Sequence, residues 1–281
     1  MKVVNTLVND KNNLKICLIA DIHFCHNYKI KKFDKIITNI KKNNPNYICI
    51  VGDIIDTSDV DEDMDMKYLY NFITNLASIT KVIIALGNHD ISHYVTKKEI
   101  TYRYPKKMVE NFKKISNVIF LDNEQYIEND ICFIGYTQGF NSNHHETGFE
   151  KEVALEVSNI TKNLKDTNYN ILLSHNPLYV GRHEVYSCIK NFNLINIVLS
   201  GHTHNGLLPT FIKTNKVLIS PMKNFFVSNA RGHFKIANAD VIVNGGIIKF
   251  SKTSGFFRFF NFLYPMNIDY VNILDDNNKN A

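Results

Sequence analysis

The chain has 281 residues, and its 32 lysine and arginine residues exceed its 27 aspartate and glutamate residues by five. A chain of this length can bury a sizeable core, as one large α/β domain or two small ones. The mildly basic balance lacks the dense cationic surface of a dedicated nucleic-acid binder, although it suits an anionic substrate. Five cysteines without a CxxC spacing argue against a disulfide framework and favour a reducing compartment.

The first half of the chain alternates between short apolar runs and amphipathic stretches. Strands are expected at 14–20, 47–51 and 82–86. Helices are expected around 30–40, around 69–76 and from near Pro105, because proline suits a first helical turn. This alternation indicates βαβ units and a largely parallel sheet.

The second half is richer in short strands. Strands are expected at 118–121, 131–135, 170–173 and 196–199, with a helix over 150–164. After residue 204 the pattern predicts strands at 217–219, 240–243 and 270–273 without a clear helix among them. This late region indicates a second sheet rather than a second domain. Because no linker rich in Gly, Pro or Ser divides the chain, we expect one domain over 1–281, with an aromatic tail at about 255–281.

Five polar motifs follow five of the predicted strands. They are Asp21-Ile22-His23, Gly52-Asp53, Gly87-Asn88-His89-Asp90, Ser174-His175 and Gly201-His202-Thr203-His204. Ligands gather outside the carboxyl ends of strands in an open α/β sheet, so these loops are expected to meet in one crevice. Their oxygen and imidazole groups, with no thiolate among them, leave Mn, Fe, Zn or Co as the candidate metals.

Each motif alone is common in proteins without a metal. A single histidine beside a strand is usually a surface or satisfied core residue, and a Gly-Asp pair is common in turns. All five together, each after a strand, favour two metal ions and a hydrolytic reaction. The carboxylate of Asp53 can bridge two cations, which an imidazole cannot. Asp21 and His23 are expected to lie in an extended segment with both side chains on one side, as are His202 and His204.

The motif series resembles that of the calcineurin-like metallophosphoesterase superfamily over residues 16 to 204. The stretch from Gly206 to Pro209, the run Asn244-Gly245-Gly246 and the aromatic end with Arg258 resemble a bacterial branch of small phosphohydrolases. The resemblance implies an α/β fold, a four-layer sandwich of two mixed β-sheets flanked by helices. It implies that Asp53 bridges two ions together with a water or hydroxide. The other implied ligands are Asp21, His23 and His204 for the first ion, and Asn88, His175 and His202 for the second.

Three further residues receive roles from this resemblance. His89 matches the histidine that faces the substrate phosphate and helps to protonate the leaving oxygen. Asp56 stands three residues after Asp53, where several members carry an aspartate that orients that histidine. In the aromatic stretch 256–264, Arg258 is a candidate for binding a phosphate. We expect this stretch to pack against the sheet; the alternative is a hydrophobic rim for a lipid-like or aromatic leaving group, or for peripheral membrane contact.

The functional prediction is a dinuclear-metal phosphohydrolase that cleaves phosphate mono- or diesters by in-line attack of a metal-bridging hydroxide. The alternatives are a nuclease of the same superfamily and a non-catalytic scaffold that retains the fold. The expected partner is a phosphate-ester substrate, and no dedicated nucleic-acid module or transmembrane segment is predicted. The absence of a secretory pattern at the N-terminus predicts a cytoplasmic location.

Overall fold

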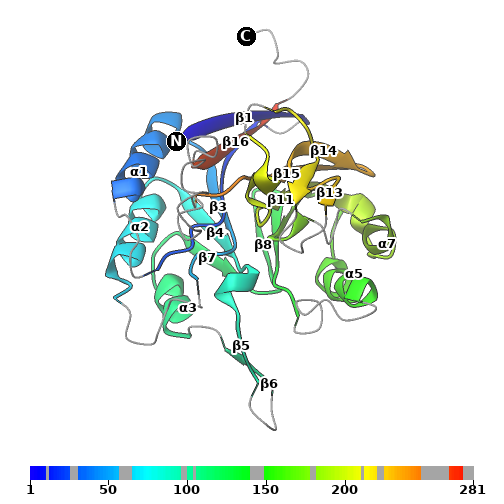
Figure 1. The fold of residues 1–281 in the computed structure, drawn as a ribbon, viewed down its shortest axis with the longest axis horizontal. Helices are drawn as coiled ribbons and strands as arrows, with labels where there is room; N and C mark the ends of the chain where they lie inside the picture. Colours follow the sequence, from blue (N-terminus) through cyan, green and yellow to red (C-terminus); the bar gives the residue numbers. More distant parts are fainter. Residues whose placement is uncertain are drawn as a thin grey trace.

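The computed structural model describes residues 1–10, 13–25, 31–56, 65–95, 100–103, 106–139, 149–177, 182–209, 212–219, 225–247 and 266–274. Two six-stranded mixed sheets pack face to face, and helices cover both outer faces (Figure 1). The predicted four-layer α/β sandwich of two mixed β-sheets is therefore confirmed.

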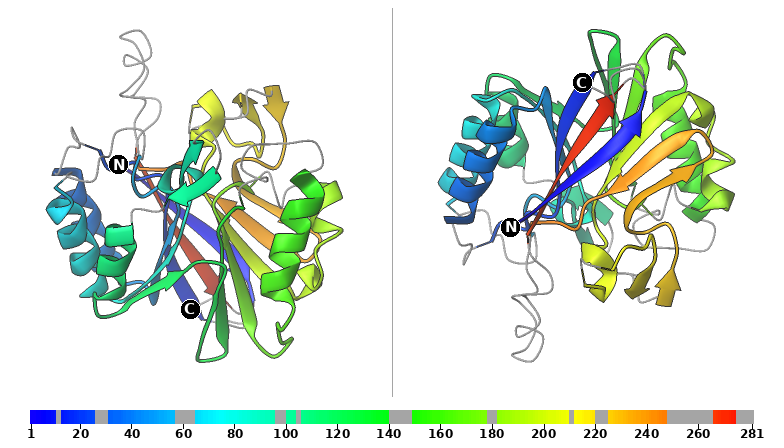
Figure 2. Two further views of the ribbon diagram at one scale, coloured as in Figure 1. Left: turned by 90° about the horizontal axis from the view of Figure 1, so that it is seen from below. Right: turned by 90° about the horizontal axis from the view of Figure 1, so that it is seen from above.

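The first sheet has the strand order β1-β16-β2-β3-β4-β7. Its strands are β1 (Lys2–Asn9), β16 (Asn267–Leu274), β2 (Leu14–Ile19), β3 (Tyr47–Val51), β4 (Lys81–Ala85) and β7 (Val118–Leu121). The last four run parallel, whereas β16 is antiparallel to β2 and parallel to β1. Because β1 and β16 come from opposite ends of the chain and lie side by side, both ends contribute to one sheet (Figure 2, blue and red).

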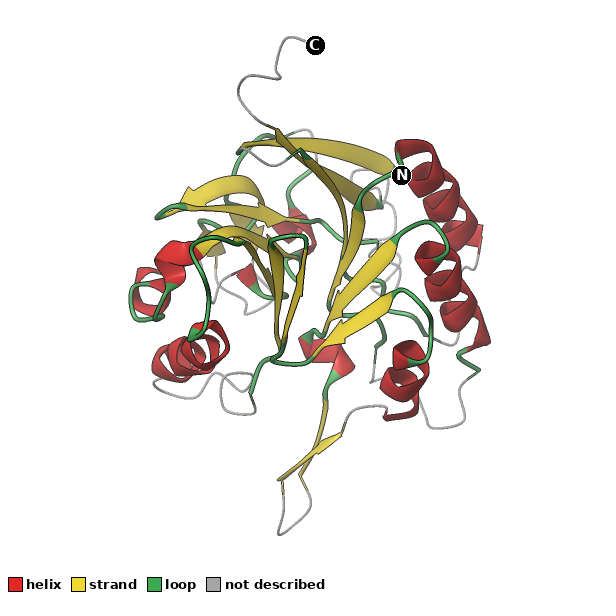
Figure 3. Cartoon of the chain, turned by 180° about the vertical axis from the view of Figure 1, so that it is seen from behind, coloured by secondary structure: helices red, strands yellow, loops and turns green. Residues whose placement is uncertain are grey.

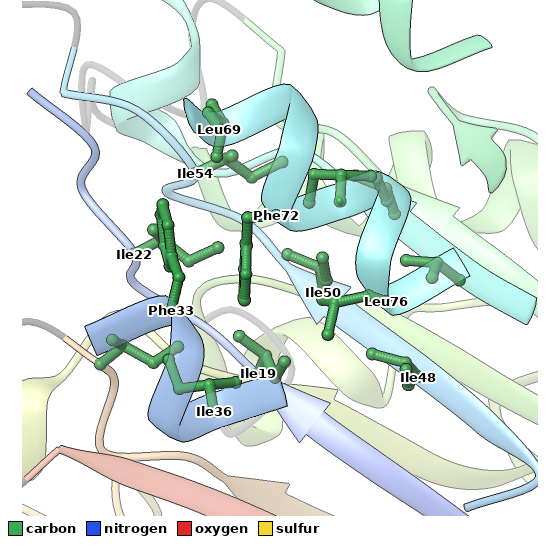
Figure 4. Packing of buried hydrophobic residues seen from close by; sticks show 14 of the residues in the cluster. Ile19, Ile22, Phe33, Ile36, Ile48, Ile50, Ile54, Leu69, Phe72 and Leu76 are labelled. Atoms are coloured by element: carbon green, nitrogen blue, oxygen red, sulfur yellow. The ribbon is translucent and has the colours of Figure 1, made fainter. Parts of the chain in front are cut away.

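Three helices cover the outer face of the first sheet (Figure 3). They are α1 (Lys31–Asn43), α2 (Lys67–Ala77) and α3 (Lys106–Lys113). The rings of Phe33 from α1 and Phe72 from α2 stack with centroids 4.0 Å apart, above Ile19 and Ile50 of the sheet (Figure 4). Apolar residues at helical spacing thus bury one face of each helix against the strands, as the sequence predicts.

The second sheet has the order β14-β15-β11-β10-β9-β8. Its strands are β14 (Gly232–Ile236), β15 (Ala239–Val243), β11 (Ile195–Ser200), β10 (Tyr169–Ser174), β9 (Ile131–Tyr136) and β8 (Gln125–Glu128). The helices α5 (Phe149–Thr161) and α7 (His183–Tyr186) pack on its outer face. The central strands β9 and β10 are buried at every position, which explains their continuous apolar runs.

The late strands do not together form the second sheet, so that prediction is wrong in part. β15 joins the second sheet, but β16 inserts into the first between β1 and β2. A separate two-stranded ribbon is formed by β12 (Val217–Ile219) and β13 (Phe225–Val227), and another by β5 (Ser92–Val95) and β6 (Ile100–Arg103). The physical reason is that apolar alternation reports burial of a strand but does not identify its partners. Of the predicted tail, 267–274 is β16, and the aromatic stretch 256–264 lies outside the described residues.

Candidate metal centre

Backbone hydrogen bonds join the loops that follow β2 and β3, and others join the loops that follow β10 and β11. The Asp21 N–H donates to the Gly52 carbonyl at 3.1 Å, and the His23 N–H donates to the Asp53 carbonyl at 2.9 Å. Across the second sheet, the Gly201 N–H donates to the His175 carbonyl at 2.9 Å. Segments far apart in the sequence therefore meet at one edge of the sandwich, as the carboxyl ends of neighbouring parallel strands do.

Five of the non-glycine motif residues have a left-handed backbone. The φ angles are 53° for Asp21, 46° for His23, 52° for Asp53, 69° for His202 and 46° for His204. The expectation of extended segments at Asp21–His23 and His202–His204 is therefore wrong, because β2 ends at Ile19 and β11 ends at Ser200. Such non-glycine conformations cost on the order of 1 kcal/mol or more each and persist where surrounding contacts fix them.

Two groups of potential ligand atoms that share no residue form at this edge. Asp21, His23 and His204 make one group, and Asp53, His175 and His202 make the other; within each group the ligand atoms lie within 4.8 Å of one another. Oδ2 of Asp53 is 3.0 Å from Nε2 of His175 and 3.5 Å from Nε2 of His23. The Asp53 carboxylate therefore lies between the two groups.

Several buried polar atoms in this region lack a hydrogen-bond partner among the described residues. Both ring nitrogens of His23 and Oδ1 of Asn88 are buried and have no hydrogen-bond partner among the residues that the structure describes. Asn88 begins the short 3-10 turn η1 (Asn88–Asp90), whose His89 N–H donates to Oδ1 of Asp53 at 2.8 Å. Buried polar atoms are normally paired, and a cation would satisfy these lone pairs. The donor set thus fits metal binding.

The charge states of the buried groups support the same fit. Burial raises the pKa of Asp21. Burial would also raise the pKa of Asp53, but the rings of His175 and His23 outweigh this effect and hold that pKa well below its usual value. Burial lowers the pKa of His23 to about 3 and that of His202 well below its usual range. His23 and His202 are therefore neutral bases beside buried carboxylates, a combination suited to a cation.

The ring of His175 is fixed by the first sheet. Its Nδ1–H donates to the Val51 carbonyl at 2.8 Å, which leaves Nε2 directed at the Asp53 carboxylate. Burial would lower the pKa of His175, but the charge of Asp53 outweighs burial and raises this pKa to about 10. A proton on Nε2 thus occupies the place that a cation would take between these two side chains.

The family model described as calcineurin-like phosphoesterase matches residues 14–206. The chain belongs to this family. An uncharacterized metallophosphoesterase of Campylobacter jejuni is 28% identical over 208 residues, which cover 73% of this chain and 47% of that protein. A Bos taurus transmembrane protein with a metallophosphoesterase domain is 26% identical over 207 residues, covering 72% of this chain and 43% of that protein.

Among solved structures, the purple acid phosphatase of yellow lupin seeds is similar with a TM-score of 0.46 and 13% identity, covering 84% of this chain and 44% of that chain. This phosphoesterase chain spans about half the length of the curated relatives that it matches. In the described part of the chain, every helix is too short or too polar to cross a membrane.

Asp90 of the phosphoesterase ties two of the motif loops together, a role that the sequence patterns did not predict. Its Oδ1 accepts the N–H groups of Ile54 and Ile55 at 2.8 and 3.0 Å, and its Oδ2 accepts the Gly87 N–H at 2.8 Å. Asp90 is fully buried, and burial raises its pKa to about 7. The position of Asp90 at the end of the motif Gly87-Asn88-His89-Asp90 could have indicated this role from the sequence.

His89 and Asp56 lie beside the first group. Oδ1 of Asp56 is 3.4 Å from Nδ1 of His89, and the His89 ring is 4.8 Å from that of His23. The His89 side chain is 43% exposed, whereas Asp56 is buried, so the imidazole is accessible from solvent while its partner is not. The potential ligand atoms of His23, Asp56 and His89 also lie within 4.8 Å of one another. Metal binding is therefore the alternative role for His89.

One predicted site residue is not described, and two other histidines have partners elsewhere in the fold. Arg258 lies outside the described residues. His233 on β14 is 2.6 Å from Oδ1 of Asp240, and His183 on α7 contacts the Tyr186 ring. Of the ten residues predicted for the site, the structure therefore gathers the side chains of eight through direct contacts, and Asn88 through its neighbour His89.

Proposed function

We propose that the protein is a two-metal phosphohydrolase that cleaves phosphate mono- or diesters. The observation that carries the proposal is the position of the Asp53 carboxylate between two ligand groups, 3.0 Å from His175 and 3.5 Å from His23. Membership of the calcineurin-like phosphoesterase family supports the phosphoester class of substrate. The metal is proposed to be Mn, Fe, Zn or Co, since the available donors are nitrogen and oxygen.

The proposed ligands of the two ions follow the two groups. They are Asp21, His23 and His204 for one ion, and Asn88, His175 and His202 for the other, with Asp53 shared. Two bound cations supply positive charge for the phosphoryl oxygens and lower the pKa of a water towards neutrality. The hydrogen bonds to Val51 and from the His202 N–H to Asp21 would hold these side chains in place before substrate binds.

In the proposed reaction, water attacks phosphorus in line with the leaving oxygen, and His89 donates a proton to that oxygen. The exposure of His89 supports this role, because the ring can reach a substrate while its partner Asp56 stays buried. Asp56 would orient Nδ1 of His89 and stabilise the protonated ring. The proposed ligands Asp21, His23, Asp53 and His175 are all buried, in contrast to His89.

The first experiment is a panel of aryl phosphate mono- and diesters assayed with Mn, Fe, Zn and Co. We expect metal-dependent hydrolysis of at least one ester and binding of two metal ions per chain. A protein that binds no metal and hydrolyses none of the esters would contradict the proposal and favour a scaffold. Hydrolysis of single- or double-stranded DNA in preference to the aryl esters would identify a nuclease instead.

The role of His89 has a separate test. His89→Ala should lower kcat by about 10²- to 10⁴-fold, the usual contribution of a general acid, without changing metal content. His183→Ala is the matched control, because His183 lies on α7 and contacts Tyr186 instead of the centre. An unchanged kcat would remove His89 from the reaction, and a loss of metal would make it a ligand.

We further propose that residues 1–281 form one phosphoesterase domain in the cytoplasm. The pairing of β1 with β16 supports a single domain, since strands from both ends complete one sheet. Free thiols at Cys17, Cys25, Cys49, Cys132 and Cys188 support a reducing compartment.

A further inference from the structure

The β12–β13 ribbon stands beside the candidate metal centre. It contacts the turn η3 (His204–Leu207), which begins with a proposed ligand, and Figure 2 shows the ribbon in gold at the rim of the molecule next to η3 in yellow. Val217 pairs with Val227, and the fully buried Val217 packs with Ala230. The base of the ribbon is therefore anchored by a small apolar cluster.

Two aromatic side chains on this ribbon are largely in solvent. Phe225 is 67% exposed and Phe226 is 70% exposed, more than any other large apolar side chain in the described part of the chain. Phe226 also adopts a left-handed φ of 54°, which is rare for a bulky residue. An exposed aromatic pair, one of which has a strained backbone, is unfavourable for stability, which points to a binding role.

The segment that contains the ribbon has an excess of basic residues. Residues 201–239 contain five basic residues and no aspartate or glutamate, and the remaining 27 basic residues of the chain are matched by 27 acidic ones. Lys213 and Lys216, close to the ribbon in the sequence, are exposed. Of the other described basic residues of this segment, Arg231 is buried and Lys235 lies 3.5 Å from Oδ2 of Asp240, so among the described residues Lys213 and Lys216 supply the exposed unpaired charge.

We propose that the β12–β13 ribbon docks the protein onto the surface of an anionic lipid bilayer. Phe225 and Phe226 enter the boundary between headgroups and acyl chains, and Lys213 and Lys216 contact the anionic headgroups. Interfacial membrane binding combines apolar insertion with flanking lysines. A protein partner fits less well, because lysine is depleted from protein–protein interfaces. The inference is independent of the proposed function, since it concerns the ribbon and not the chemistry of the metal centre.

The first test uses the absence of tryptophan from the chain. Phe225→Trp introduces a single fluorescent probe on the ribbon, and Leu155→Trp introduces a matched probe on α5, where Leu155 is 63% exposed. With vesicles of phosphatidylcholine and phosphatidylglycerol, we expect a blue shift of the emission for Phe225→Trp and none for Leu155→Trp. No shift in Phe225→Trp, or equal shifts in both variants, would overturn the proposal.

The second test measures sedimentation with the same vesicles. The double variant Phe225→Ser/Phe226→Ser should bind at least about tenfold more weakly than the wild type, since two apolar side chains no longer insert. Lys213→Glu/Lys216→Glu should also weaken binding, and raised salt should weaken binding of the wild type. Leu155→Ser should bind like the wild type. Wild-type binding by either double variant would contradict the docking surface.

Two controls separate membrane docking from damage to the metal centre and from self-association. Hydrolysis of a water-soluble aryl phosphate should be unchanged in the Phe225→Ser/Phe226→Ser variant, so failure of docking and failure of the metal centre are distinguishable. The oligomeric state of the wild type and of this variant should be the same by light scattering. A wild-type oligomer that this variant dissociates would identify the ribbon as an interface between copies and overturn the membrane proposal.

Discussion

The two sheets bring different chemistry to the candidate metal centre. The loops after β2 and β3 of the first sheet supply the carboxylates of Asp21 and Asp53, whereas the proposed ligands from β10 and β11 of the second sheet are the imidazoles of His175, His202 and His204. The first-sheet half is negatively charged, and the second-sheet half is neutral or positively charged depending on protonation.

Atoms of the first sheet also hold the histidines of the second. Val51 accepts a hydrogen bond from the His175 ring, and the Asp21 carboxylate accepts the His202 N–H at 3.0 to 3.1 Å. Between the sheets lies an apolar layer that includes Leu18 and Leu173. Neither half is therefore a complete site, because packing of this layer brings the histidines to the carboxylates and to the backbone carbonyl of Val51.

Removal of one ligand from each half is expected to have the largest effect. Asp53→Asn should lose both metal ions, because Asp53 lies between the two groups, and activity should fall by more than about 100-fold. His175→Ala should lose only one ion, because it leaves Asp21, His23 and His204 intact. Elemental analysis of the purified variants is the measurement. Full metal content in Asp53→Asn would exclude a shared ligand.

The next largest effect concerns Asp90, which joins the loops of the first half. Asp90→Ala leaves three buried N–H groups without their acceptor and should lower the free energy of unfolding by about 3–5 kcal/mol. Asp65→Ala is the control, because Asp65 accepts one N–H, from Lys67, at an exposed position. Urea unfolding of both variants checks this expectation. Equal stabilities for the two variants would mean that Asp90 does not hold the loops.

A pair of glycines tests how tightly Asp21 is packed. Gly246 and Gly232 both have positive φ angles, 82° and 68°, so alanine at either position costs about 1 kcal/mol through backbone strain. A Cβ at Gly246 would lie 2.8 Å from Cβ of Asp21, whereas a Cβ at Gly232 would meet nothing closer than 3.9 Å. Gly246→Ala alone should weaken metal binding, by about 10- to 100-fold in a metal titration. Equal affinities would show that Asp21 tolerates displacement.

The smallest effect concerns Asp269, a buried first-sheet carboxylate with a hydrogen bond from Thr6 outside the centre. Burial raises its pKa to about 6, so the folded protein binds this proton more tightly than the unfolded chain. The free energy of unfolding of the wild type therefore falls as pH rises from about 4 through about 6. Above that range Asp269 is ionised in both states and causes no further fall.

Asp269→Asn removes this charge and should stabilise the protein by about 1–3 kcal/mol at pH 8, with little effect at pH 4. Thermal unfolding at the two pH values is the measurement, and Asp166→Asn at an exposed position is the control. Activity should be unchanged, because Asp269 is not among the proposed ligands. A stability difference independent of pH would contradict a raised pKa.

Local sequence patterns predicted much of the fold and many of the residues at the centre. The strands before all five motifs form within a residue or so of their predicted ends, because apolar runs of that length bury well in a parallel sheet. The residue types of the motifs also predicted the donor atoms that meet around Asp53. The edge strands β1, β8 and β14 were not predicted, since their polar positions weaken the apolar pattern.

Local sequence was enough to identify the side chains that can bind a metal and the strands that precede them, because donor chemistry and apolar periodicity are local properties. The insertion of β16 into the first sheet, the left-handed backbone at five of the motif residues and the joining of two motif loops by Asp90 became visible only in the fold. These features depend on contacts between segments that are separate in the sequence. Their free energy comes from packing and hydrogen bonds that form when the two sheets meet.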